Sequence, residues 1–167
     1  MATRGVEWGL PRGSPVSIAI DADEHGLELK RVLCGLLAER GVPFEDLAYL
    51  NSHQADYPDV ALNLALQVQQ GRFDRGILIC GTGLGMAMVA NKVRGVFAGT
   101  CHDVYSAERL RKSNDAQVIC LGALVVGPES AKTIITAWLA SEFQGGRSER
   151  KVARIRAIER EMCDGST

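Results

Sequence analysis

The chain has 167 residues, which is enough for one compact domain with a full hydrophobic core and too few for two. Its 19 Lys and Arg residues nearly balance 20 Asp and Glu residues, so the protein lacks the overall charge that non-specific binding to nucleic acid or to anionic membranes requires. No apolar run reaches the roughly 18 residues that span a bilayer, and the first fifteen residues contain no signal-peptide core, so we expect a cytoplasmic protein with no nucleic-acid and no membrane partner.

The first elements in chain order are a leader, a strand and a helix. Residues 1–15 contain two Pro and three Gly and predict a flexible leader. Val16 to Ile20 is a short apolar run that ends at acidic residues, which is typical of a buried strand. The next segment has leucines at helical spacing and stops at Gly41, so it predicts a helix.

The same alternation of strand and helix continues to about residue 139. The predicted elements are a weak strand near 44–48, a helix over 58–70, a strand over 76–80, a short helix through 91, a strand near 96–101, a helix from 105, a strand over 117–121 and a helix over 129–139. Strands separated by helices require right-handed crossovers and a parallel sheet that is covered on both faces. The sequence therefore predicts an α/β sandwich with about five strands.

The C-terminal segment after Gly145 and Gly146 is basic. It predicts a helix over 146–162 with an apolar stripe formed by Val152, Ile155 and Ile158. From composition alone, this helix is a solvated face with some contact to the rest of the domain. We include it in a single domain over residues 16–162.

The cysteines and histidines do not have the spacing of a metal site or of a disulfide framework. The cysteines are odd in number and include no CxxC pair; the five are Cys34, Cys80, Cys101, Cys120 and Cys163. The three histidines, His25, His53 and His102, are widely separated. We therefore expect no bound metal.

The strongest local signal is residues 79–85, ICGTGLG, where a buried strand runs into alternating glycines and then a helix. Ligands of parallel α/β folds bind at the carboxyl ends of the strands, where glycines admit a ligand and free amides form an anion or oxyanion hole. A tight turn without a ligand is the simpler alternative. A dinucleotide fingerprint is weak, because Met86 stands where its last glycine belongs, although Asp103 is suitably spaced for the ribose-binding acid.

Cys80 ends the buried strand of this motif. A cysteine there is usually an inert small hydrophobe. Here it precedes the amides of a helix start, which should favour the thiolate form and make Cys80 a general base near neutral pH. The other four cysteines lack this setting, and we interpret them as structural.

Several short motifs occur together and in order along the chain. They are Ile18-Ala-Ile-Asp-Ala-Asp23, Asp56-Tyr57-Pro58, Ile79-Cys-Gly-Thr-Gly-Leu-Gly-Met86, Ala90-Asn91-Lys92, Tyr105-Ser106-Ala107, Ser113-Asn114-Asp115-Ala116 and Gly145-Gly146-Arg147. In this combination, the stretch from about Val16 to Glu161 resembles the type B ribose-5-phosphate isomerases and their galactose-6-phosphate isomerase relatives.

The resemblance implies a three-layer α/β/α sandwich with a Rossmann-like five-stranded parallel sheet. It implies a homodimer, possibly a dimer of dimers, with active sites at the interface, a C-terminal helix used in dimerisation, a small phosphosugar as substrate and no cofactor. Cys80 matches the base that moves a proton between C2 and C1 through an enediolate, and the loop that holds the oxyanion matches Gly81, Gly83 and Gly85.

Other positions match residues that contact the substrate. The remaining substrate-binding candidates are Asp23, Glu24, Tyr57, Asn114, Arg147 and Lys151. Among these, Arg147 matches a phosphate-binding arginine that the partner subunit contributes. Thr82 and His102 are catalytic candidates for moving hydroxyl protons or opening the sugar ring.

The chain departs from the family pattern at four positions. Ser113 stands where a ring-opening histidine is common, Glu24 where a histidine is common, Leu124 where a phosphate-binding arginine is common, and Lys151 where a second arginine is expected. A lysine binds phosphate as a point charge without the bidentate fork of arginine. A tetrose 4-phosphate needs no ring opener, because the oxygen that would close its furanose ring is esterified.

The function we expect is the isomerisation of ribose 5-phosphate to ribulose 5-phosphate. Isomerisation between erythrulose 4-phosphate and erythrose 4-phosphate is the alternative within the family. A non-catalytic module that binds a phosphosugar or a nucleotide is the alternative from another class, and Cys80 argues against it because binding alone needs no base.

Overall fold

The computed structural model describes residues 17–163, and the expected leader over residues 1–15 lies outside them, as does Val16. Five strands form one sheet: β1 (Ile18–Ala22), β2 (Phe44–Asp46), β3 (Arg75–Cys80), β4 (Ala98–Thr100) and β5 (Val118–Gly122). All pairings are parallel and the order is β2-β1-β3-β5-β4, which confirms the predicted parallel sheet.

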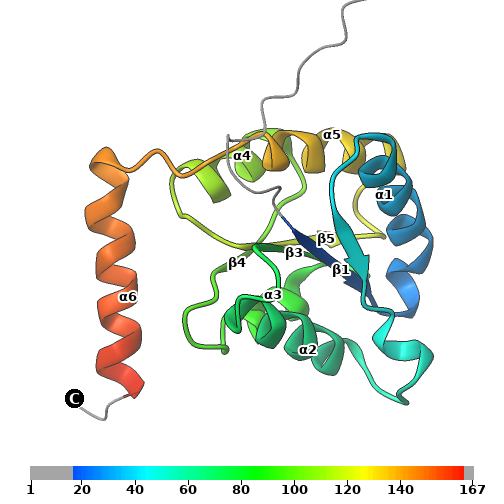
Figure 1. Ribbon diagram of the computed structural model, residues 1–167, viewed down its shortest axis with the longest axis horizontal. Helices are drawn as coiled ribbons and strands as arrows, with labels where there is room; N and C mark the ends of the chain where they lie inside the picture. The colour runs from blue at the N-terminus through cyan, green and yellow to red at the C-terminus, as the bar shows by residue number, and fades with distance from the viewer. Residues whose placement is uncertain (1–16, 164–167) are drawn as a thin grey trace, which may run out of the picture.

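Helices cover both faces of this sheet, as Figure 1 shows. They are α1 (Leu27–Glu39), α2 (Tyr57–Gln69), α3 (Leu84–Ala90), α4 (Val104–Lys112), α5 (Pro128–Leu139) and α6 (Glu149–Cys163). One buried cluster joins the sheet to α1, α4 and α5, and a second joins it to α2 and α3. The molecule is thus the expected three-layer α/β/α sandwich.

The predicted ends of helices and strands differ from the observed ones mainly where the backbone departs from regular helix or strand geometry. The strand near 44–48 ends at Asp46, because Ala48 adopts a left-handed conformation with φ of 44°. Three short 3-10 turns, Glu24–Gly26, Tyr49–Asn51 and Gly146–Ser148, were not predicted. A single turn is too short for an apolar period to develop in the sequence.

The order of the strands creates a switch point between β1 and β3. The chain moves from β1 to β2 on one side of the sheet, and from β3 it continues on the other side to β4 at the edge and then back to β5 beside β3. Ala22 pairs with Ile79, so the residues that follow these two strands emerge side by side. Ligands of open α/β sheets bind in the crevice at such a point.

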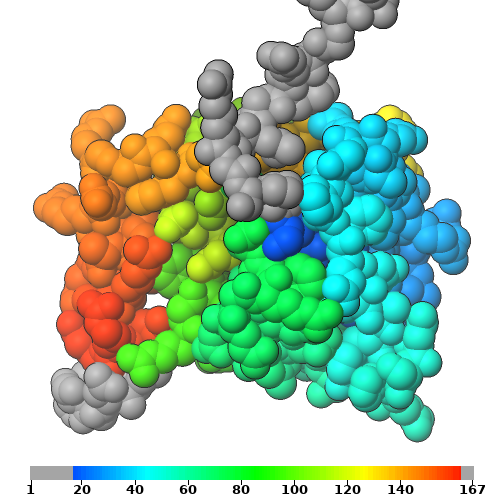
Figure 2. All heavy atoms as spheres, in the orientation of Figure 1, coloured from blue at the N-terminus to red at the C-terminus, as the bar shows by residue number. Residues whose placement is uncertain are grey.

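The last helix, α6, stands at the edge of the molecule, and Figure 2 shows an opening between it and the body. Val152 of α6 is buried, and two polar contacts also join α6 to the body of the domain. Glu159 accepts a hydrogen bond from the Gly95 amide at 2.9 Å, and Arg156 forms an ion pair with Asp115 at 2.8 Å. Ile155 and Ile158 are exposed.

None of the helices within residues 17–163 has the length and apolar character needed to cross a membrane.

Candidate active site

Cys80 ends β3 on the face of the sheet that packs against α2 and α3. The residue is 5% exposed, and its Sγ accepts a hydrogen bond from the Gly83 amide at 3.0 Å. Gly83 has φ of 77°, and a Cβ there would lie 2.9 Å from the backbone carbon of Leu121. The turn that points an N–H at the sulfur therefore requires glycine at position 83.

The other described cysteines lie in environments that disfavour a thiolate. Burial raises the pKa of Cys101 to about 11 and raises that of Cys120 still further, and burial also raises the pKa of Cys34. These thiols stay protonated at neutral pH, which agrees with their interpretation as structural residues.

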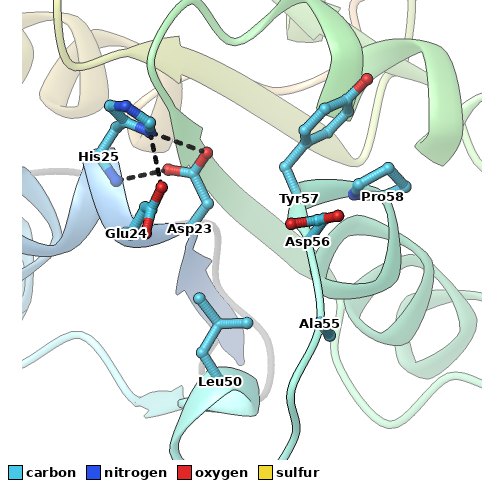
Figure 3. Close-up of a pocket in the computed structure, with 8 residues that line it drawn as sticks. All are labelled: Asp23, Glu24, His25, Leu50, Ala55, Asp56, Tyr57 and Pro58. Atoms are coloured by element: carbon cyan, nitrogen blue, oxygen red, sulfur yellow. Dashed lines mark hydrogen bonds and ion pairs between the residues drawn. The ribbon is translucent and has the colours of Figure 1, made fainter.

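Cys80 opens onto a cavity at the switch point between β1 and β3. Its lining residues are Asp23, His25, Tyr57, Cys80, Gly81, Thr82, Gly85 and Leu124. An adjoining pocket, drawn in Figure 3, is lined by Asp23, Glu24, His25, Leu50, Ala55, Asp56, Tyr57 and Pro58. Asp23, His25 and Tyr57 line both, so the two form one continuous depression, which we call the Cys80 cavity.

Asp23 ties the turn after β1 to the end of β3. Its carboxylate Oδ1 accepts from the amides of His25 at 3.0 Å and of Gly26 at 3.1 Å. Its own amide donates to the Ile79 carbonyl at 3.0 Å. A Cβ at Gly26 would lie 2.5 Å from that carbonyl oxygen, so the turn presses directly on the strand that carries Cys80.

Tyr57 reaches the cavity across Gly85. A Cβ at Gly85 would lie 2.4 Å from Cε2 of Tyr57, so the phenol ring rests on the glycine backbone. Tyr57 begins α2, where Asp56 and Asp59 form a capping box and Pro58 occupies the first turn. The Asp56-Tyr57-Pro58 motif therefore starts a helix in a way that places a phenol at the cavity.

The structure does not bring His102 to the Cys80 cavity. It is absent from the lining residues, and its Nε2 accepts a hydrogen bond from the Gly122 amide at 3.0 Å.

Asp103, which the dinucleotide interpretation would use to bind a ribose, caps α4 instead. Its carboxylate accepts hydrogen bonds from the amide of Ser106 at 2.7 Å and from the hydroxyl of Ser106 at 2.6 Å. Those hydrogen bonds also lower the pKa of Asp103.

The basic candidates line a separate groove between α4 and α6. Its lining residues are Arg109, Ser113, Gly146, Arg147, Ser148, Arg150 and Lys151, and we call it the basic groove. It shares no lining residue with the Cys80 cavity. Asn114 is exposed beside Ser113 and lines neither of them. Within one chain, the predicted site residues thus fall into two sets.

Six residues that line the Cys80 cavity were not predicted as site residues: His25, Leu50, Ala55, Asp56, Pro58 and Leu124. His25 was counted only as one of three separated histidines, although its place two residues after Asp23 was a usable signal. Leu124 was noted only as a departure from the family pattern. It is 75% exposed, and a Cβ at Gly81 would lie 3.4 Å from its Cδ1.

Within residues 17–163, no three His, Cys, Asp or Glu side chains gather in a way that could hold a metal ion.

A sequence model of the ribose/galactose isomerase family matches residues 18–155. The chain belongs to this family. A D-erythrulose-4-phosphate isomerase of Pectobacterium atrosepticum is 52% identical over 84% of this chain and 93% of its own length. A ribose-5-phosphate isomerase B of Listeria innocua is 48% identical over 86% of this chain and 97% of its own length.

Solved structures of the ribose/galactose isomerase family have the same fold. Ribose-5-phosphate isomerase B of Clostridium thermocellum aligns with a TM-score of 0.83 at 42% identity, covering 87% of this chain and 99% of its own. The enzyme of Mycoplasma genitalium with bound ribulose 5-phosphate aligns with a TM-score of 0.81 at 35% identity, covering 87% and 97%. The family resemblance and the isomerase interpretation are therefore confirmed.

Proposed function

We propose that this chain is a cofactor-free aldose–ketose isomerase that converts ribose 5-phosphate to ribulose 5-phosphate, with Cys80 as the base. The observation that carries the proposal is the position of the sulfur. Sγ lies at the switch point of the sheet, opens onto a cavity and accepts an N–H from Gly83 at 3.0 Å. The hydrogen bond from Gly83 holds the sulfur beside the cavity in which proton abstraction takes place.

The reaction requires one base and a place for negative charge. The Cys80 thiolate takes the proton from C2 of the open-chain sugar, and the thiol returns it to C1 after an enediolate has formed. The Gly81–Gly85 loop is the part of the cavity where backbone amides stabilise the charged sugar oxygen. Asp23, Glu24, Tyr57 and Thr82 offer polar atoms to the sugar hydroxyls.

A homodimer would join the two halves of the site. The basic groove is separate from the Cys80 cavity within one chain, and a second copy could bring its Arg147 and Lys151 to the cavity of the first. The exposed Ile155 and Ile158 on α6 are suited to a contact between subunits. The family match over residues 18–155 supports a single isomerase domain over residues 16–162.

A four-carbon substrate is the second candidate. Ser113 cannot supply an imidazole for ring opening, and Leu124 places an apolar side chain where a phosphate-binding arginine is common. The Pectobacterium relative at 52% identity is named a D-erythrulose-4-phosphate isomerase. Comparing kcat/KM for ribose 5-phosphate and erythrulose 4-phosphate decides between the two substrates.

The role of Cys80 is tested by Cys80→Ala, with Cys34→Ala as the matched control outside the cavity. Loss of the base should lower kcat by about 10³-fold or more, while thermal unfolding stays near that of the wild type. The control should retain full turnover. A folded Cys80→Ala variant with near-normal kcat would refute the proposed base. A purely binding protein would be stabilised by the sugar phosphate without exchanging its C2 proton in deuterated water.

Mixing two inactive variants tests whether the site is shared between subunits. Cys80→Ala and Arg147→Ala homodimers are each expected to be nearly inactive. After subunit exchange, half of the dimers are mixed and each mixed dimer has one intact site, so turnover should recover to about a quarter of the wild-type value. Recovery will not occur if Arg147 serves the Cys80 of its own chain.

A further inference from the structure

We propose that His25 is a second catalytic residue, which moves a proton between the two sugar oxygens while Cys80 moves a proton between the two carbons. This inference rests on the proposed isomerase function. Among the histidines in residues 17–163, only His25 lines the Cys80 cavity, and it lines both of the depressions that form it.

The imidazole of His25 stands beside the loop that follows Cys80. A Cβ at Gly81 would lie 4.0 Å from Cγ of His25, so the ring and the Cys80–Gly81 backbone are neighbours. The turn that carries His25 is fixed from two sides, because Asp23 accepts its amide and Gly26 packs against the Ile79 carbonyl. The turn that carries the imidazole is therefore fixed against the end of the strand that carries the base.

Two carboxylates lie near one nitrogen of the ring. Nδ1 of His25 lies 3.7 Å from Oδ2 of Asp23 and 3.9 Å from Oε1 of Glu24, as the dashed lines in Figure 3 show. Both distances are longer than a hydrogen bond, so they are electrostatic contacts with Nδ1, and neither carboxylate faces Nε2. Nε2 of His25 is thus the atom that can serve a substrate in the cavity.

The other two histidines are engaged elsewhere. Nε2 of His102 accepts from the Gly122 amide at 3.0 Å. The ring of His53 stacks on Tyr49 with centroids 4.0 Å apart, and its Nδ1 lies 3.0 Å from the Tyr49 carbonyl oxygen. Neither histidine lines the cavity. Within one subunit, His25 is therefore the described imidazole that lines the cavity.

The step balances without any further reactant. The Cys80 thiolate takes the proton from C2 to give the enediolate, and the protonated His25 then gives its Nε2 proton to the charged oxygen on C1, which leaves an enediol, a thiol and a neutral imidazole. Nε2 then takes the proton from the oxygen on C2 as that carbonyl forms. The thiol returns its proton to C1, and both residues regain their starting states.

The test is His25→Gln, with the exposed His53→Gln as the matched control. Loss of an acid–base group should lower kcat by about 10²-fold or more with little change in KM. His53→Gln should keep kcat. Imidazole added to His25→Ala should restore part of the lost rate, which a purely structural role of His25 would not allow. A kcat of His25→Gln within about threefold of the wild type overturns the proposal.

Acyclic substrates separate proton transfer from ring opening. Ribulose 5-phosphate cannot close a furanose ring, because the oxygen that would close it carries the phosphate, and erythrulose 4-phosphate has no hydroxyl at the position that a furanose ring requires. His25→Gln should slow the exchange of their C1 protons with deuterated water as strongly as it slows turnover. Normal exchange, with a loss confined to ribose 5-phosphate, would overturn the proposal in favour of ring opening. A wild-type protein that exchanges no proton of either ketose would instead refute the isomerase function itself.

Discussion

The Cys80 cavity and the basic groove differ in how their ion pairs are held. Beneath the cavity, Lys30 is only 6% exposed and pairs with Asp21 at 3.3 Å and Asp46 at 2.7 Å. Beside the groove, Arg156 is 47% exposed and pairs with Asp115 at 2.8 Å. A buried charge must keep its partner, whereas an exposed charge is already solvated. Buried charges therefore anchor the elements that lead into the cavity, whereas the proposed phosphate ligand Lys151 lies on a helix that is held by an exposed ion pair.

The buried ion pair also shapes the cavity. Oδ2 of Asp21 accepts from the Tyr49 amide at 3.1 Å, which positions the turn that carries Leu50 in the cavity wall. Burial by itself would lower the pKa of Lys30, but the hydrogen bond and charge of Asp46 and the charge of Asp21 outweigh it and raise that pKa. The network thus keeps Lys30 charged in the folded protein.

The largest effect on stability is expected from Lys30→Met. Removing the lysine leaves the buried carboxylate of Asp21 without its cation, which should lower the free energy of unfolding by about 3–5 kcal/mol at pH 7. Urea unfolding measures this loss. Lys132→Met, which breaks an exposed pair with Glu129, is the matched control and should leave the free energy of unfolding nearly unchanged.

The pH dependence sharpens the same prediction. Because the pKa of Lys30 is raised in the fold, its stabilisation is fully present below the ordinary value of 10.5 and is lost as the pH rises through the raised value. Lys30→Met should remove this alkaline loss. Equal stability losses for Lys30→Met and Lys132→Met would show that the two ion pairs do not differ as their burial indicates.

A smaller effect is expected from Gly83→Ala. A side chain at a left-handed φ of 77° costs about 1–2 kcal/mol, and its Cβ would also meet the Leu121 backbone at 2.9 Å. The turn must then move its N–H away from the Cys80 sulfur, so kcat should fall together with stability. Gly81→Ala is the comparison for urea unfolding, because a Cβ there meets side-chain atoms, of Leu124 at 3.4 Å and of His25 at 4.0 Å. Equal stability losses would contradict this account of the turn.

The smallest effect is expected from Arg156→Ala beside the basic groove. Its pair with Asp115 is exposed, so the free energy of unfolding should fall by no more than about 1 kcal/mol. Thermal and urea unfolding at a fixed protein concentration measure the change, since a dimer would make stability depend on concentration. A loss of unfolding free energy as large as that of Lys30→Met would show that the ion pair of α6 stabilises its own subunit as strongly as the buried ion pair of Lys30 does.

Local patterns predicted most of the fold. Apolar runs and helical spacing located every strand and each of the six helices to within a few residues, because those patterns reflect burial on one face of an element. The glycines after Cys80 marked the ligand-binding edge correctly as a turn between strand and helix. The 3-10 turn at Glu24–Gly26 has no such period, and so the sequence pattern did not mark His25 as a cavity residue.

The sequence by itself determined the alternation of elements, the parallel sheet and the glycine turn after Cys80, because each depends on residues that are close along the chain. Only the tertiary structure decided that His25 faces the cavity and that His102 binds the Gly122 amide. It also decided that Arg147 lies in a groove apart from Cys80. These outcomes depend on contacts between segments that are far apart in sequence. The order of the strands and the hydrogen bonds of the backbone amides determine where each of these side chains points.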